Sequence, residues 1–197
     1  VCMATSGPGA TNLITGIIDA KMDSIPIVAI TGQVASTLLG SDAFQETDIM
    51  GATFPLVKHS YMIQNVEEIP RIIHEAFYIA SAGRPGPVVI DLPKDVVMAE
   101  GDYQEGTYTS ETGHRSYRPR TEPDNAAVDA AMELIVNAER PIFYSGGGII
   151  NSGPAASEAL TRFVRETGYP ITNTLMGLGT YPASDAQFLG MLGMHGT

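Results

Sequence analysis

Residues 66–92, VEEIPRIIHEAFYIASAGRPGPVVIDL, indicate the fold class because a helical pattern leads directly into a buried strand. Apolar side chains recur at helical spacing as far as residue 80, which predicts an amphipathic helix over 66–82. Gly83 then favours the end of that helix. Residues 87–92 form an apolar run typical of a strand that is covered on both faces. A helix that leads into such a strand is the repeating unit of a parallel α/β sheet.

The same alternation extends in both directions along the chain. Before residue 66 we expect strands at 1–5, 25–31 and 57–63 and helices at 10–22 and 41–51. After residue 123 we expect a helix at 124–139, a strand at 141–144, a tight glycine loop at 146–148, a helix at 154–167 and a strand at 170–174. The inward face of the 124–139 helix is predicted to carry Val128, Met132, Ile135 and Val136.

Residues 100–124 contain no Ile, Leu, Val, Met or Phe, so they cannot supply a core and indicate a linker. We therefore predict a first domain at 1–98, a linker at 99–123 and the start of a second, Rossmann-like α/β domain at 124–197. The chain opens inside a predicted strand and stops in a glycine-rich stretch. We expect neighbouring sequence on both sides, and an inactive protein without it.

Composition and charge exclude several classes of protein. Lys and Arg total 11 against 22 Asp and Glu, for a net charge of −11, and a surface that acidic repels nucleic acid. One cysteine, Cys2, excludes a disulfide framework and a cysteine-rich zinc site, and the four histidines show no metal-ligand spacing. No apolar run approaches the roughly 20 residues of a membrane span. We expect a cytoplasmic protein with no metal ligands of its own and no nucleic-acid or membrane partner.

Glycine-rich and polar segments adjoin the predicted strands, and we expect them at the carboxyl edge of the sheet, where open α/β sheets bind ligands. They are SGPGATN at 6–12, GQV at 32–34, DAFQE at 42–46, GRPGP at 83–87 and DLPKDV at 91–96. A Gly-Pro-Gly turn taken alone favours an ordinary strand-to-helix connection over a ligand site.

Taken in this order, the five segments resemble the thiamine diphosphate enzymes. DAFQE, together with LGMHG at 192–196, more closely resembles the catalytic large subunits of acetohydroxyacid (acetolactate) synthases, and the resemblance covers nearly the whole chain. It implies a transferase that decarboxylates pyruvate on thiamine diphosphate and condenses the two-carbon unit with a second 2-keto acid. That reaction belongs to branched-chain amino acid biosynthesis. The first domain would bind the pyrimidine half of the cofactor, and the second would contribute to an FAD site.

The resemblance also implies roles for individual residues. Pro8 and Asn12 would contact the pyrimidine end of thiamine diphosphate. Phe44 and Gln45 would face the reacting carbons, and Lys94 would lie near the substrate channel. The FAD contacts implied are Arg84, Gly146, Gly147, Gly148, Leu175, Met176, Met194, His195 and Gly196.

The residues alone leave structural alternatives open. Arg84 could form a surface ion pair, Lys94 could pair with Asp95, and Phe44 and the methionines could fill a core. Gln45 could belong to a polar helix face, and His195 could be solvated.

The partners implied are pyruvate, 2-ketobutyrate, a second copy of the chain in a homodimer or tetramer, and a regulatory small subunit. Mg²⁺ would be held by ligands outside these 197 residues, and the glutamate that activates the pyrimidine would lie upstream of Val1. A plastid or mitochondrial location stays open. Three alternative functions also stay open: a different thiamine diphosphate carboligase, a pyruvate oxidase and a non-catalytic binding module. The sequence departs from the family at Ala35, where many members carry proline.

Overall fold

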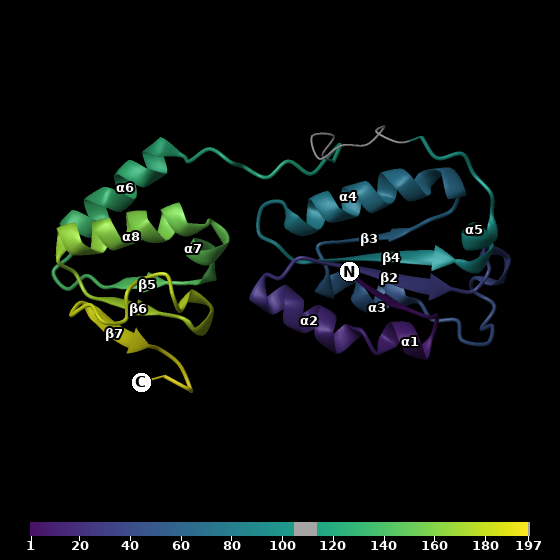
Figure 1. The fold of residues 1–197 in the computed structure, drawn as a ribbon, viewed down its shortest axis with the longest axis horizontal. Helices are drawn as coiled ribbons and strands as arrows, with labels where there is room; N and C mark the ends of the chain where they lie inside the picture. Colours follow the sequence, from purple (N-terminus) through teal and green to yellow (C-terminus); the bar gives the residue numbers. More distant parts are fainter. Residues whose placement is uncertain (105–113, 197) are drawn as a thin grey trace. The chain divides into compact units, whose positions relative to one another are not determined.

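The computed structural model describes residues 1–104 and 114–196, and these form two compact units, Val1–Thr121 and Glu122–Thr197. Each unit is a parallel sheet with helices packed on it (Figure 1). The predicted α/β class with parallel sheets is confirmed. Part of the predicted linker, 105–113, lies outside the described residues.

The first unit is built on four parallel strands in the order β1-β2-β4-β3. The strands are β1 (Cys2–Ala4), β2 (Ile27–Gln33), β3 (His59–Met62) and β4 (Pro87–Pro93). The helices are α1 (Pro8–Thr11), α2 (Ile14–Asp23), α3 (Ile49–Thr53), α4 (Ile69–Ser81) and α5 (Lys94–Met98). Single 3-10 turns occur at Ser36–Leu38, Phe54–Leu56 and Val66–Glu68.

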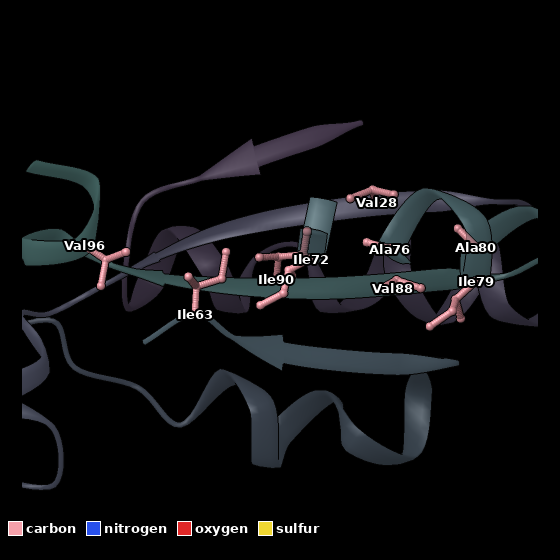
Figure 2. Packing of buried hydrophobic residues seen from close by; sticks show 9 residues of the cluster. All are labelled: Val28, Ile63, Ile72, Ala76, Ile79, Ala80, Val88, Ile90 and Val96. Atoms are coloured by element: carbon pink, nitrogen blue, oxygen red, sulfur yellow. The ribbon is translucent and has the colours of Figure 1, made fainter. Parts of the chain in front are cut away.

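Two apolar layers cover the central strand β4. Val88 and Ile90 pack under α4, in the cluster of nine side chains shown in Figure 2. Val89, one step along the strand, points to the opposite face and packs with Ile17 of α2. All three β4 residues are fully buried, as expected for a strand that is covered on both faces. Tyr117 also packs against the α4 cluster, and its hydroxyl donates to the Ala82 carbonyl at 3.2 Å.

The second unit has three parallel strands in the order β5-β6-β7: β5 (Phe143–Ser145), β6 (Ile171–Asn173) and β7 (Phe188–Met191). Its helices are α6 (Asn125–Val136), α7 (Gly147–Asn151) and α8 (Pro154–Thr167), and a 3-10 turn spans Leu175–Gly177. Val164 of α8 packs against Ile171 and Tyr181 to form the core.

Several predicted elements were wrong. Helix 10–22 is divided into α1 and α2, and no helix forms over 41–48, where Asp42 and Gln45 adopt positive φ angles that a right-handed helix does not allow. Residues 146–148 are not a tight loop, because Gly147 and Gly148 begin α7. The inward face predicted for α6 is also wrong, since Val128, Met132 and Val136 are exposed and Ile135 is half-buried. Helix α5 and strand β7 were not predicted.

No helix among the described residues is long and apolar enough to cross a membrane.

Candidate cofactor sites

The turn after β1 brings two of the predicted segments together. Gly7 has φ 60° and ψ −119°, a conformation that glycine alone adopts readily. A Cβ atom on Gly7 would lie 2.8 Å from the Gln45 carbonyl oxygen. Pro8 then begins α1, and Asn12 ends it with an N–H that donates to the Pro8 carbonyl at 3.2 Å. Pro8, Asn12 and Gln45 are all exposed, so this corner presents polar groups and open backbone to a ligand.

Residues 39–48 form a loop that holds its shape through one acidic side chain. The Glu46 carboxylate accepts hydrogen bonds from the backbone N–H groups of Gly40 and of Ala43, the latter at 3.0 Å. These donors lower the pKa of Glu46, the Gly40 N–H most strongly. Phe44 stands at the tip with 88% of its surface exposed, and Gln45 follows with φ 62°. The structure therefore places Phe44 on the surface, and the alternative role as a core residue is excluded for the chain as described.

Beneath this loop lies a buried polar cluster that the sequence did not reveal. Asp91 in β4 is fully buried and lies opposite Thr31 of β2. Its Oδ1 accepts from the Thr31 hydroxyl at 2.7 Å, and its Oδ2 accepts from Gln33 Nε2 at 3.0 Å. Burial raises the pKa of Asp91, although the hydrogen bonds from Thr31 and Gln33 oppose that shift. The signal available was the period-two spacing of Thr31 and Gln33, which places both on one face of β2.

The segment that carries Lys94 is tied to the chain after β2. Asp95 accepts hydrogen bonds from the Ser36 hydroxyl and, at 2.8 Å, from the Ser36 N–H. Both bonds lower the pKa of Asp95, and the bond from the Ser36 hydroxyl has the larger effect. Lys94 is exposed as the first residue of α5, and within the described ranges it forms no ion pair with Asp95. Its side chain is therefore available at the carboxyl end of β4, as the resemblance requires.

Arg84 is not brought to the edge of the sheet that we expected. It precedes β4, and Pro87 pairs with Ile27, so segment 83–87 lies at the amino ends of both strands. The expectation that this segment adjoins the carboxyl edge was wrong, because 83–86 connect α4 to the start of the strand. The Arg84 Nε donates to the Ser24 hydroxyl at 2.8 Å, and the exposed guanidinium forms no ion pair among the described residues.

In the second unit, the glycine segment and the Leu175–Gly177 turn are in contact. A Cβ atom on Gly147 would lie 3.1 Å from the Met176 Cβ, and one on Gly177 would lie 2.4 Å from the Ser145 carbonyl oxygen. A groove of about 400 Å³ opens beside them, lined in part by Gly146 and Gly148. Leu175 and Met176 are both exposed at this position.

The last predicted segment follows β7, and parallel pairing brings it to the same edge. Leu192 donates its N–H to the carbonyl of Asn173, the last residue of β6, at 3.2 Å. Met194 is 92% exposed, and His195 and Gly196 are also exposed. Asn173 itself is fully buried; its Nδ2 donates to the Gly177 carbonyl at 2.9 Å, whereas its Oδ1 has no partner among the described residues.

Comparisons with known families and proteins agree with this arrangement. Residues 1–52 match the model "Thiamine pyrophosphate enzyme, N-terminal TPP binding domain", and residues 128–197 match "Thiamine pyrophosphate enzyme, central domain". The chain belongs to the thiamine pyrophosphate enzyme family. The resemblance seen in the sequence is therefore confirmed, and the two matched domains fall in the two compact units.

Curated relatives within this family are named acetolactate synthases. The large subunit from Corynebacterium glutamicum is 51% identical over 197 residues, and the acetolactate synthase of Mycobacterium leprae is 49% identical over 197. The chloroplastic acetolactate synthase of Arabidopsis thaliana is 48% identical over 199 residues. All of this chain is matched, but it spans only 31%, 31% and 29% of these three proteins. The residue roles given above stay predictions.

Proposed function

We propose that this chain forms part of an acetolactate synthase large subunit, which decarboxylates pyruvate and joins the two-carbon unit to a second 2-keto acid, pyruvate or 2-ketobutyrate. The observation that carries the proposal is the identity of about half of all residues with synthases of bacteria and of a plant, along the whole chain. In this proposal the product supplies valine, leucine and isoleucine biosynthesis.

The corner formed by Gly7 and the 39–48 loop fits the pyrimidine end of thiamine diphosphate. The missing Cβ of Gly7 lets the Gln45 backbone pack against the turn, and the Pro8, Asn12 and Gln45 side chains are exposed there. When bound, the cofactor supplies the carbon nucleophile of the reaction. Gln45 would donate a hydrogen bond to a developing charge without adding charge itself. Phe44 would exclude water from the reacting atoms, and Lys94 would attract the substrate carboxylate from the neighbouring strand end.

The second unit fits one side of a flavin nucleotide. The groove lined in part by Gly146 and Gly148 lets a ligand approach the backbone, and the exposed Met176 and the buried Asn173 Oδ1, which has no partner among the described residues, lie at the same edge of the sheet. Residues 194–196 would close this site from the third strand. Arg84 is a further proposed FAD contact, because its exposed guanidinium can donate to phosphate or flavin oxygens. We propose that FAD has a structural role here.

The remaining parts of the proposal lie outside the chain. Mg²⁺ would be held by residues of a further domain, and the enzyme would assemble as a homodimer or tetramer. Several relatives are named as large subunits, which favours a smaller regulatory partner. The protein would be cytoplasmic in a bacterium, and the chloroplastic relative keeps a plastid location open.

A graft tests the activity directly. The chain is placed in the Corynebacterium glutamicum large subunit in exchange for the 197 matching residues, and acetolactate formation from pyruvate is measured. We expect an active enzyme that lets a strain lacking acetolactate synthase grow without added branched-chain amino acids. A folded graft that binds thiamine diphosphate and oxidises pyruvate, or leaves it unchanged, would refute the proposal.

Two exposed phenylalanines supply a matched control for the site. Phe44 is 88% exposed in the 39–48 loop, and Phe54 is 76% exposed in the 3-10 turn after α3. Neither is part of a core, so alanine at either position should leave folding intact. We expect Phe44→Ala to lower turnover of the graft at least tenfold and Phe54→Ala to leave it unchanged. Equal turnover in the two variants would remove Phe44 from the site.

A further inference from the structure

The buried cluster under the 39–48 loop has a polar character that the fold of the sheet does not require. Asp91 is flanked in β4 by fully buried apolar residues such as Ile90, and it is itself fully buried. No Lys or Arg side chain forms an ion pair with it in residues 1–104 and 114–196. A carboxylate in such surroundings is costly unless neutral donors stabilise it, so apolar residues of similar size would fill the site at lower cost.

Gln33 connects this carboxylate to the loop. Its side chain is 6% exposed, and its Nε2 donates both to Asp91 Oδ2 at 3.0 Å and to the Thr47 carbonyl at 2.8 Å. Its Oε1 accepts from the Val34 N–H at 2.8 Å, so the orientation of the amide is fixed from both ends. Asp91 therefore holds Gln33, and Gln33 holds the backbone at Thr47.

Thr47 lies two residues after Gln45. The Thr47 carbonyl also accepts from the Ile49 N–H at 2.8 Å, so it joins the loop to the start of α3. On its other side, Gln45 is confined by Gly7, since only a missing Cβ lets the two backbones approach. The Gln45 backbone, with φ 62°, is in a region that non-glycine residues rarely occupy, and it persists only where the surroundings hold it.

We propose that Gln33 and Asp91 are positioning residues that fix the 39–48 loop, and through it Gln45, against the sheet. The inference rests on the proposed function for the role of Gln45, but the geometric part, the fixing of the loop, stands without it. Thr31 does not share this role, because its hydroxyl donates to the same carboxylate and to the Ile90 carbonyl and forms no hydrogen bond with the loop among the described residues.

Amide hydrogen exchange on the chain itself tests the geometric part. Gln33→Met keeps the side-chain length and removes the donors to Asp91 and Thr47. Thr31→Val is the matched control, because it also removes one donor from the buried carboxylate and leaves the link to the loop intact. We expect Gln33→Met to speed exchange at the amides of Ala43, Glu46 and Ile49 at least tenfold beyond any change in Thr31→Val. Equal exchange in the two variants would overturn the proposal.

Kinetics of the graft test the connection to Gln45. Gln33→Met and Gln45→Ala should each lower kcat about tenfold. Each variant should keep the KM for pyruvate within twofold of the value of the unchanged graft. The double variant should be no slower than Gln45→Ala alone, because both changes remove the same contact. Rates that multiply in the double variant would contradict positioning through Gln45. If the unchanged graft forms no acetolactate, the proposed function fails, while hydrogen exchange still decides whether Gln33 fixes the loop.

Asp91→Asn provides a conservative replacement. The asparagine Oδ1 can still accept from Gln33, and its Nδ2 can donate to the Thr31 hydroxyl. We expect loop exchange and kcat within about threefold of the parent in Asp91→Asn, and the full Gln33→Met effect in Asp91→Leu. If Asp91→Asn and Asp91→Leu speed loop exchange and lower kcat to a similar extent, the Asp91 carboxylate has a role other than accepting the hydrogen bond from Gln33.

Discussion

Replacing Gly7 by alanine tests whether the turn after β1 is limited by space as well as by backbone conformation. Gly7 combines a positive φ of 60° with ψ −119°, and a Cβ there would lie 2.8 Å from the Gln45 carbonyl oxygen and 3.0 Å from its Cα. The strain in such a conformation costs about 1–3 kcal/mol, and forcing apart close-packed backbone costs about as much again. We expect Gly7→Ala to lower the free energy of unfolding of the first unit by about 2–6 kcal/mol.

Two other glycines separate these contributions. Gly40 has φ 81° and nothing within 4 Å of an added Cβ, so Gly40→Ala should cost only the strain, about 1 kcal/mol. Gly16 lies inside α2 with ordinary φ and open space, so Gly16→Ala should stabilise by about 0.5–1 kcal/mol. From the most to the least stable protein, the expected order is thus Gly16→Ala, the parent, Gly40→Ala and Gly7→Ala.

Urea unfolding followed by NMR measures this order for each unit separately. The amide of Ile90 reports on the first unit, and that of Val164 reports on the second. With a slope of about 2 kcal/mol per molar urea, Gly7→Ala should move the midpoint at Ile90 down by about 1–3 M. The midpoint at Val164 should not move. Equal losses for Gly7→Ala and Gly40→Ala would refute the argument that Gln45 lies against the turn.

Three further predictions concern the same unit. Because the pKa of Asp95 is lowered in the folded chain, the contribution of its Ser36 bonds is present above the ordinary pKa of about 3.9 and lost as the pH falls through the folded value. The urea midpoints of Ser36→Ala and the parent should therefore differ at pH 7 and converge below about pH 3; a constant difference would contradict this. Ala35 has φ −57° and ψ 145°, which proline adopts without strain, so Ala35→Pro should raise the free energy of unfolding by about 0.4–1 kcal/mol, and a loss would show that the ring clashes. Arg84→Ala should change stability by less than about 1 kcal/mol, since its hydrogen bonds are exposed, yet lower FAD retention of the graft after dialysis about tenfold; unchanged flavin content would remove Arg84 from the FAD site.

The sequence predicted those elements whose shape depends on apolar periodicity. Strand β4 and helix α8 lie where the patterns placed them, because a continuous apolar run and a long amphipathic stripe each have one stable arrangement against a core. A helix was predicted over 41–51, where residues 41–48 belong to a loop. The form of this loop depends on hydrogen bonds that Glu46 accepts and Gln33 donates, and no local pattern reveals them.

For the candidate sites, too, the sequence predicted some features and missed others. The resemblance predicted that Pro8 and Gln45 act at one cofactor site, and the structure brings their segments together, since Gly7 packs against Gln45. The role of Asp91 was missed because one acidic residue in an apolar strand gives no indication of its partners 58 and 60 residues away. The position of Arg84 was misjudged because the motif gives an order along the chain, whereas the edge of the sheet depends on which side of β4 it adjoins.

The strand order β1-β2-β4-β3 also affects how the chain folds during synthesis. Strands β2 and β3 do not pair with each other, because β4 lies between them and pairs with both. A ribosome that has completed β3 has therefore made a strand with no partner, and it must still add α4 before β4 appears. At about 5–20 residues per second, the roughly 60 residues from the start of β2 to the start of β4 take about 3–12 s. During that interval the edge of β2 that pairs with β4 has no partner, and the sheet is complete only when β4 has been made.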